Sequence, residues 1–361
     1  MPLSFDKPPE SLCILRLSAI GDVTHVLPIV RTLQSVWPRT KITWIIGKTE
    51  AALISDIEGI EFIIFDKNEG WQAYKKLHST LSGRRFTVLL HMQAALRASI
   101  ASLIIRADTK IGFDKARSRD FQHLFTNVSI SGNPRVHVVD TFFQFLQAMG
   151  INSKILRWDI PVSEKDVKFA QQSLENRETL VINPCTSVRA KNWRNWDIER
   201  YATVIDYAAV NYDLNIVLTG GPAKEERAFG EAIVELAHTK VNNLIGKSSL
   251  KQLQAILAAA RVVIAPDTGP AHMAAAAGVP VIGLYASSNP LRTGPYRSLP
   301  WTINTDPEAL QLYNQQREDN VQWGKRVRSN NVMDTIEIND VTDMLDEVMR
   351  LTTKNQGDKL S

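Results

Sequence analysis

Several features that would mark a membrane, secreted or metal-dependent protein are missing from this sequence. Cysteine occurs only twice in 361 residues, at Cys13 and Cys185, and neither belongs to a Cys-x-x-Cys pair. This spacing argues against a zinc or redox centre, so both thiols are expected to be reduced and structural. No apolar run reaches the ~18 residues that span a bilayer. The N-terminus carries acids and prolines in place of an apolar signal region. We therefore expect a cytoplasmic protein.

A large excess of one charge is also missing. The net charge of +4 is too small to indicate a nucleic-acid-binding protein. It is unevenly placed, because residues 1–160 carry a net charge of +6 and the remainder carries −2. The stretch from Arg84 to Arg135 alone holds nine basic and three acidic residues. Such a stretch suits an anionic substrate or an anionic membrane surface, and it equally suits a solvated face with no ligand.

Short apolar runs alternate with amphipathic helical segments along most of the chain. The runs expected to form strands are Leu12–Leu17, Ile42–Ile46, Phe62–Phe65, Thr87–His91, Leu180–Asn183, Asn215–Thr219, Val262–Ala265 and Pro280–Tyr285. Buried runs that alternate with helices predict parallel sheets covered on both faces. The alternation restarts near Leu180, after a polar segment from Asp159 to Glu178. We therefore predict an α/β protein with two doubly wound domains facing each other across a cleft.

The predicted domains are residues 1–160, residues 161–335 and a closing segment at 336–361, which contains a helix at Asp340–Leu351. A chain of this length is more than one core usually holds, which also favours two domains. Ligands in doubly wound folds bind outside the carboxyl ends of the strands. The loops that follow the strands are therefore expected to carry the chemistry.

Two of these loops present groups that suit catalysis or phosphate binding. The loop from Leu17 to Asp22 leads into a helix, and Gly21 permits a close turn. Asp22 is either a helix cap or a general base, and this loop alone does not decide between them. After a second strand come the hydroxyls of Thr186 and Ser187 and then Lys191, which together could bind phosphate oxygens.

Two further loops suit a nucleotide. Gly220 and Gly221 follow a strand and permit close approach of the backbone to a ligand. Either Glu225 or Glu226 could then accept hydrogen bonds from ribose hydroxyls, or both could simply favour the helix dipole. The most specific signal is Asp267-Thr268-Gly269-Pro270-Ala271-His272, between an apolar strand and an alanine-rich helix. N–H groups at this helix start would bind an anion.

With these loops in hand, the sequence resembles glycosyltransferase family 9, the heptosyltransferases of lipopolysaccharide synthesis. Three motifs carry the resemblance: Arg16-Leu17-Ser18-Ala19-Ile20-Gly21-Asp22, Lys191-Asn192-Trp193 and Asp267-Thr268-Gly269-Pro270-Ala271-His272. They agree in order and in loop placement, and the resemblance spans roughly Leu12 to Pro295. It implies the GT-B fold, with two Rossmann-like domains, the active site between them and a last helix that crosses back to the N-terminal domain.

The resemblance also implies an inverting transfer of heptose from ADP-heptose, without a metal or a cofactor. Asp22 would be the general base, and Lys191 would offset charge on the leaving diphosphate. The other donor contacts that the resemblance implies are Thr186, Ser187, Glu225 or Glu226, Ser248, Asp267, Thr268, Gly269 and His272. The acceptor would be Kdo-lipid A or a heptose already on it, reached at the inner membrane by peripheral contact.

The acceptor side is where this chain departs from the family pattern. Gln93-Ala94-Ala95-Leu96 stands where family members often have Gln-Gly-Leu. The candidate acceptor contacts are Ser18, Gly21, Arg97, Arg117 and Arg119, and each arginine could equally be a surface residue.

Three other functions remain open at this point. The same fold could use another nucleotide sugar or acceptor. A nicotinamide-dependent oxidoreductase is disfavoured because Ser18-Ala19-Ile20-Gly21-Asp22 lacks the Gly-x-Gly-x-x-Gly pattern. A non-catalytic nucleotide-binding protein would be unaffected by Asp22→Ala.

Overall fold

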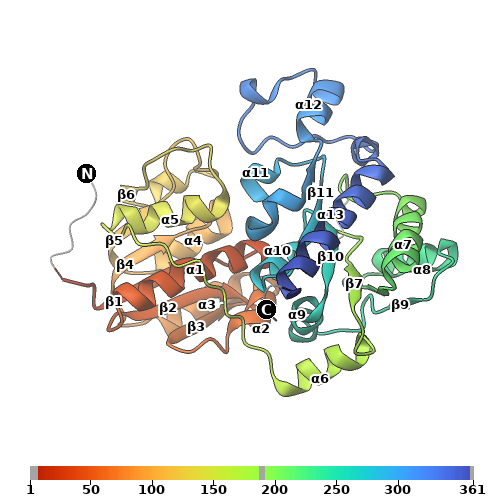
Figure 1. The fold of residues 1–361 in the computed structure, drawn as a ribbon. Helices are drawn as coiled ribbons and strands as arrows, with labels where there is room; N and C mark the ends of the chain where they lie inside the picture. Colours follow the sequence, from red (N-terminus) through yellow and green to blue (C-terminus); the bar gives the residue numbers. More distant parts are fainter. Residues whose placement is uncertain (1–6, 187–191, 358–361) are drawn as a thin grey trace. The chain divides into compact units, whose positions relative to one another are not determined.

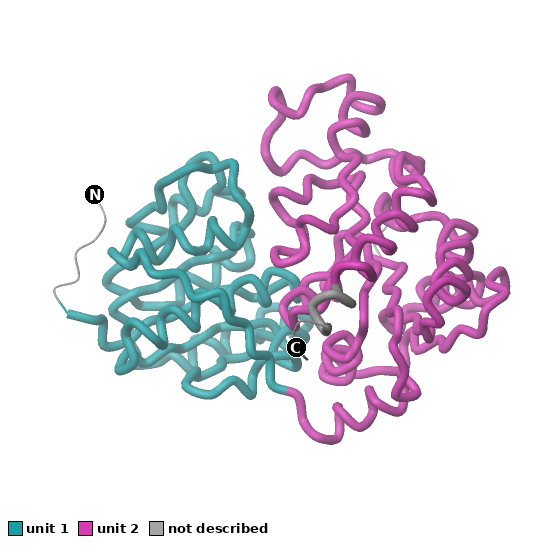
Figure 2. Tube along the Cα trace, in the orientation of Figure 1, with its two compact units in different colours: residues 1–161 teal, residues 162–361 magenta. Residues whose placement is uncertain are grey.

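The computed structural model describes residues 7–186 and 192–357 (Figure 1). The chain forms two compact units, Met1–Pro161 and Val162–Ser361, called unit 1 and unit 2 below (Figure 2). The polar segment expected between two domains, 159–178, contains this division and also a helix, α6. Ser163 caps that helix, because its hydroxyl accepts a hydrogen bond from the Asp166 N–H at 3.2 Å. Among the described residues, no helix combines the length and the apolar character needed to cross a membrane.

Unit 1 contains a six-stranded parallel sheet in the order β3-β2-β1-β4-β5-β6. Its strands are β1 (Ser11–Leu15), β2 (Lys41–Gly47), β3 (Ile60–Phe65), β4 (Phe86–His91), β5 (Ala107–Gly112) and β6 (Val128–Ser129). Its α-helices are α1 (Ile20–Val36), α2 (Lys48–Ile54), α3 (Trp71–Thr80), α4 (Leu96–Ile104) and α5 (Val138–Ala148). Two short 3-10 helices, η1 (Lys67–Glu69) and η2 (Gln122–Leu124), lie in its loops.

The side chains of β1 explain how the helices cover this sheet. Successive residues of a strand point to opposite faces. Cys13 and Leu15 belong to an apolar cluster with residues of α3 and α4. Leu12 and Ile14 are equally buried and point to the other face. The buried thiol of Cys13 has a raised pKa because burial disfavours the thiolate, as expected for a structural cysteine.

Unit 2 repeats the arrangement with a parallel sheet in the order β12-β11-β10-β7-β8-β9. Its strands are β7 (Thr179–Ile182), β8 (Asn215–Leu218), β9 (Val241–Asn243), β10 (Val262–Pro266), β11 (Val281–Tyr285) and β12 (Thr302–Asn304). Its α-helices are α6 (Glu164–Ser173), α7 (Ile198–Tyr212), α8 (Lys224–Leu236), α9 (Leu250–Ala259), α10 (Gly269–Ala276), α11 (Pro290–Thr293), α12 (Asp306–Asn314) and α13 (Ile338–Gly357). Short 3-10 helices are η3 (Tyr296–Trp301), η4 (Glu318–Asn320) and η5 (Val332–Thr335).

The last helix, α13, is longer than the expected Asp340–Leu351. Its apolar residues Val341, Leu345 and Val348 are buried in the core of unit 2, together with Trp196 and Tyr201. The described part of the closing segment therefore packs within unit 2. A return of this helix to unit 1 stays a prediction. The predicted α/β class with two doubly wound parallel sheets is confirmed, because both sheets show the same strand order within the described residues.

Candidate functional site

The strand order of each sheet points to one place for a ligand. In unit 1 the chain winds outward in both directions from the neighbouring strands β1 and β4, and in unit 2 from β7 and β10. Ligands of doubly wound folds bind at such points, outside the carboxyl ends of the strands. The loops after these four strands contain most of the predicted site residues. We call the loops of the two units the unit 1 site and the unit 2 site.

The unit 1 site is built on an ion pair between Arg16 and Asp22. Arg16 Nη2 lies 2.5 Å from Asp22 Oδ2, and Arg16 Nη1 donates to the Met92 carbonyl after β4. The guanidinium also lies over the Phe142 ring, 5.5 Å from its centroid. The Arg16 side chain is only 10% exposed, whereas that of Asp22 is 36% exposed. A buried cation therefore holds a carboxylate that remains open to solvent.

Asp22 is also bonded to its own helix start. Its Oδ2 accepts a hydrogen bond from the Ala19 N–H at 3.3 Å, which realises the helix-cap interpretation of this residue. The cap and the ion pair fix the orientation of the carboxylate. Both are compatible with a role as a general base, because neither removes the carboxylate from solvent.

Gln93 joins the loops after β1 and β4. Its Oε1 accepts from the Leu17 N–H at 2.7 Å, and its Nε2 donates to the Ser18 hydroxyl at 3.1 Å. The loop that departs from the family pattern thus supports Ser18, one of the predicted acceptor contacts. The predicted residue Gly21 is buried in the first turn of α1.

A buried carboxyl that was not predicted from the sequence, Glu50, lies beside this pair. Burial raises its pKa, and the charges of Arg16 and Asp22 act on it in opposite directions. Gly47 is required here because an added Cβ would lie 2.3 Å from the Leu17 carbonyl oxygen. Ser18, Glu50 and Arg97 line one pocket, so the structure brings two of the predicted acceptor contacts together.

The other two predicted acceptor arginines do not line that pocket as it is formed by the described residues. Arg117 is bonded to its own loop and to α5: Nη2 lies 2.6 Å from Asp114 Oδ2, and Nη1 donates to Gln144 Oε1 of α5. Its side chain is therefore engaged in structure. Arg119 is exposed. Of the three, Arg97 is the arginine that lines this pocket.

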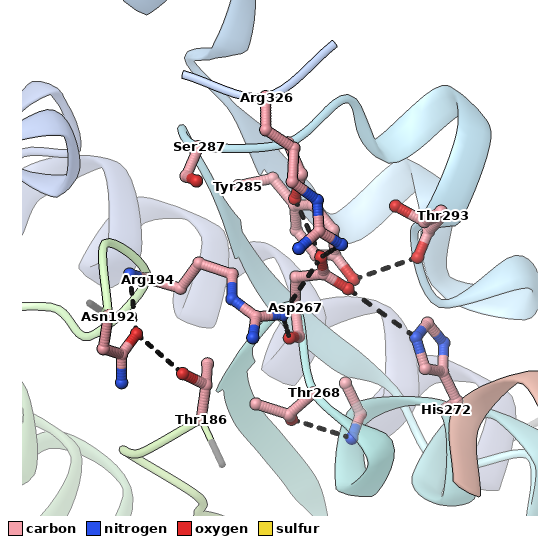
Figure 3. Close-up of polar contacts among 12 residues, drawn as sticks. Thr186, Asn192, Arg194, Asp267, Thr268, His272, Tyr285, Ser287, Thr293 and Arg326 are labelled. Carbon is pink, nitrogen blue, oxygen red and sulfur yellow. Dashed lines mark hydrogen bonds and ion pairs between the residues drawn. The ribbon is translucent and has the colours of Figure 1, made fainter. Parts of the chain in front are cut away.

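The unit 2 site is built around the buried carboxylate of Asp267, at the end of β10 (Figure 3). Its Oδ2 accepts from the Ser288 hydroxyl at 3.0 Å and lies 3.3 Å from Arg326 Nη2 and 3.4 Å from Arg194 Nη1. Arg194 Nη1 also donates to the Asp267 carbonyl at 2.7 Å. Two guanidinium groups therefore share one buried carboxylate.

The predicted anion site at α10 lies next to this carboxylate. Thr268 caps α10, with its hydroxyl accepting from the Ala271 N–H at 3.5 Å. Gly269 begins the helix, and N–H groups of a first turn have no partner within the helix. His272 Nε2 lies 3.9 Å from Asp267 Oδ1. The structure therefore brings together the four predicted residues Asp267, Thr268, Gly269 and His272.

The loop after β7 is organised by amide side chains. The Thr186 hydroxyl donates to Asn192 Oδ1 at 2.7 Å, and the Thr186 N–H donates to Asn195 Oδ1 at 3.0 Å. These bonds hold the Thr186 hydroxyl near the Arg194 segment that reaches Asp267 (Figure 3). The predicted residues Ser187 and Lys191 lie outside the described residues.

The two candidate ribose carboxylates have different surroundings. Glu226 is buried, and its Oε2 accepts from the Gly221 N–H at 2.6 Å. Burial and the charge of Glu225 raise the pKa of Glu226. Glu225 is exposed in the first turn of α8. Ser248 is half-buried immediately before α9. Glu226 is therefore bonded to the loop that precedes its helix, whereas the carboxylate of Glu225 is accessible to a ligand.

Comparison with known proteins identifies the family to which this chain belongs. A model of glycosyltransferase family 9 (heptosyltransferase) matches residues 74–321. The chain is 42% identical over 342 residues to the lipopolysaccharide core heptosyltransferase OpsX of Haemophilus influenzae, covering 94% of this chain and 97% of that protein. The chain belongs to glycosyltransferase family 9. It is therefore a glycosyltransferase, and the resemblance seen in its motifs is confirmed.

Solved heptosyltransferase structures share the fold of this family 9 chain. The Escherichia coli heptosyltransferase WaaC with ADP superposes with a TM-score of 0.68 at 21% identity, covering 94% of this chain and 98% of that one. A glycosyl transferase family 9 protein from Veillonella parvula superposes with a TM-score of 0.75 at 21% identity, covering 94% and 97%. The expected GT-B type, with two Rossmann-like units, is thereby confirmed.

The structure also adds site residues that the sequence did not single out. Arg194 lies in the Trp193-Arg194-Asn195-Trp196 segment, in which Trp196 is buried. Ser288 follows β11, and Arg326 lies in an irregular segment with no local pattern. Among the described residues, no group of three His, Cys, Asp or Glu could hold a metal ion. A metal-independent reaction stays a prediction.

Proposed function

We propose that this family 9 enzyme transfers heptose from ADP-heptose to the inner core of lipopolysaccharide. The observation that carries the proposal is the division of charge between the two sites. The unit 1 site presents a solvent-accessible carboxylate, Asp22, and the unit 2 site presents the N–H groups at the start of α10, where the helix dipole favours an anion. Inverting glycosyl transfer needs both a base and a site for an anionic leaving group.

In the proposed reaction Asp22 is the general base. It takes the proton of an acceptor hydroxyl as that oxygen forms a bond to the anomeric carbon of heptose. The bond from that carbon to the diphosphate breaks, and ADP leaves with the electron pair. Arg16 and the Ala19 N–H bind Oδ2 of Asp22, which fixes the direction of the carboxylate.

The unit 2 site is proposed to bind the nucleotide donor. The N–H groups of Thr268 and Gly269 would bind the diphosphate, with Thr186, Ser187 and Lys191 on its other side. Lys191 would offset the charge that builds on the leaving group. Asp267 and His272 would lie beside the sugar, Ser248 beside the adenine, and Glu225 or Glu226 at the ribose. Two solved neighbours, both of WaaC, contain ADP or a fluorinated ADP-heptose, which supports an ADP-linked donor here.

The acceptor is proposed to be Kdo-lipid A or heptosyl-Kdo-lipid A, bound at unit 1. Ser18, Gly21 and Arg97 would contact it, with Arg119 and Arg117 as outer cationic residues. Curated relatives named for lipopolysaccharide heptosyl transfer support this choice. The net charge of +6 in residues 1–160 favours peripheral contact with an anionic membrane, here the cytoplasmic face of the inner membrane.

The test is acceptor-dependent release of ADP from ADP-heptose by the purified protein, with truncated Kdo-lipid A as acceptor. Wild type should release ADP only when acceptor is present. Asp22→Ala should abolish release and still bind donor. Binding of ADP without release would redirect the search to another sugar or acceptor, which is the alternative function on the same fold. Unchanged turnover in Asp22→Ala would exclude this residue as the base.

A further inference from the structure

Three donor groups from three separate segments converge on one oxygen of Asp267. Arg194 comes from the loop after β7, Ser288 from the loop after β11, and Arg326 from the segment between α12 and η5. All three bind Oδ2, while Oδ1 faces His272 at 3.9 Å. Because one oxygen takes all three bonds, the carboxylate is held in a single orientation, with Oδ1 on the side of His272 (Figure 3).

Arg326 is itself held in place by its backbone. It forms an antiparallel bridge with Ser288, the residue that also binds Asp267. The neighbouring Val327 donates its N–H to the Ser287 carbonyl at 3.1 Å, and its side chain is fully buried in the unit 2 core. The guanidinium of Arg326 therefore extends from a fixed point. A planar fork that is fixed in this way orients a carboxylate better than a flexible ammonium does.

We propose that Arg326 is a positioning residue that acts through Asp267 and sets the affinity for the sugar part of the donor. The inference rests on the proposed function, in which Asp267 lies beside the donor sugar. Loss of Arg326 leaves Oδ2 with Ser288 and Arg194, so the carboxylate can turn away from the direction in which Oδ1 meets the sugar. Binding of the nucleotide part, which does not use Oδ1, is left nearly unchanged.

A purely electrostatic role for Arg326 makes a different prediction. If its charge acted directly on the diphosphate, its loss would weaken ADP and ADP-heptose equally. Arg328 is a matched control for this effect. It carries the same charge two residues further along, is exposed, and lies over the Trp193 ring at 5.8 Å instead of on Asp267.

The experiment measures dissociation constants for ADP and for ADP-heptose by calorimetry. The variants are Arg326→Ala, Arg326→Lys, Arg328→Ala, Asp267→Asn and the double variant Asp267→Asn with Arg326→Ala. Arg326→Ala should weaken ADP-heptose about 10-fold or more, as expected for a misplaced contact, and ADP less than about 2-fold. Arg326→Lys should recover part of the loss, and Arg328→Ala should match wild type.

The double variant provides the sharpest test. If Arg326 acts through Asp267, adding Arg326→Ala to Asp267→Asn should cause no further loss of ADP-heptose affinity. Additive losses, or equal weakening of ADP and ADP-heptose by Arg326→Ala, would overturn the inference while leaving the proposed function intact. Failure of the wild type to bind ADP would instead overturn the proposed function. Thermal melting checks folding, and Arg326→Gln, which removes the guanidinium and keeps a polar side chain, replaces Arg326→Ala should the latter not fold.

Discussion

The two units share one strand order. At the same point of that order, their loops expose side chains of opposite charge. In unit 1 the buried member of the ion pair is the cation, Arg16, and the carboxylate of Asp22 reaches solvent. In unit 2 the side chains of Asp267 and Arg194 are both buried, at 9% and 14% exposed, and Arg326, at 38%, is the member of the group that reaches solvent. A buried charge has to be paired. In unit 1 this pairing leaves a carboxylate accessible to a ligand. In unit 2 both guanidinium groups bind the carboxylate, and the N–H groups at the start of α10 are accessible to a ligand.

This difference explains how one duplicated scaffold can serve two roles in a transfer reaction. In the proposed reaction, unit 1 supplies an oxygen that takes a proton, and unit 2 supplies helix N–H groups that bind an anion. The β-sheets themselves carry none of this, since the strand residues that precede both sites are buried and apolar. The loop sequences after the strands decide the chemistry.

The largest effect is expected for Asp22→Asn. If Asp22 is the base, turnover should fall by about 10²- to 10⁴-fold, because the amide cannot take the acceptor proton. Affinity for ADP should be unchanged, since the nucleotide loops belong to unit 2. Steady-state turnover and calorimetry measure the two quantities. Asp108→Asn is the control, because Asp108 is an exposed carboxylate on the same sheet, paired with Arg85. Equal effects of both variants would remove the special role of Asp22.

The second effect is on stability, and it compares the arginines of the two sites. Arg16→Met should lower the free energy of unfolding by about 2 kcal/mol, because it removes the charged hydrogen bonds of a buried guanidinium to Asp22 and the Met92 carbonyl. Arg326→Met should cost less than about 1 kcal/mol, because Arg326 is partly exposed and Asp267 keeps Arg194.

Urea unfolding followed by tryptophan fluorescence measures both values. A loss for Arg326→Met as large as that for Arg16→Met would show that the burial of the two cations is not what distinguishes the sites.

A third prediction concerns Asp306, a buried carboxyl of unit 2 that, unlike Asp267, has no arginine partner among the described residues. Asp306 is buried at the start of α12, and its pKa is raised to about 7, first by burial and then by the charge of Glu318. The folded state therefore holds this proton more tightly than the unfolded state. This contribution to stability is lost as pH rises from about 4 through about 7.

Asp306→Asn should consequently stabilise the protein at pH above 7, by about 1–2 kcal/mol, and have little effect near pH 4. Unfolding measured across this range, with wild type as reference, checks the sign. A variant that is less stable at high pH would indicate that the ionised carboxylate is bound favourably, for example by the first turn of α12.

The sequence pattern alone predicts most of the fold and part of the candidate site, but it does not predict the arginines around Asp267. Asp22 and Asp267 are predicted as site residues because each follows an apolar run that predicts a strand. Arg326 lies 59 residues from Asp267 and Arg194 lies 73 residues from it, so no local pattern joins them. The sequence analysis did not predict the strand β5, Ala107–Gly112, because its polar residues interrupt the apolar run that marks the other strands. Its strand conformation comes from pairing with β4 in the sheet.

The smallest effect separates the two glutamates of α8, which sequence could not distinguish. Glu226 binds the Gly221 N–H and is buried, whereas Glu225 is exposed. Glu225→Gln should therefore weaken ADP about 2- to 10-fold by weakening a hydrogen bond to ribose. Glu226→Gln should leave ADP affinity closer to wild type and lower stability slightly, because the amide is a weaker acceptor for Gly221. Calorimetry measures the affinity of both variants for ADP. A larger loss for Glu226→Gln than for Glu225→Gln would assign the ribose contact to Glu226. In that case the Gly221 bond would have to open when the nucleotide binds, and the unit 2 site would be less preformed than its contacts around Asp267 indicate.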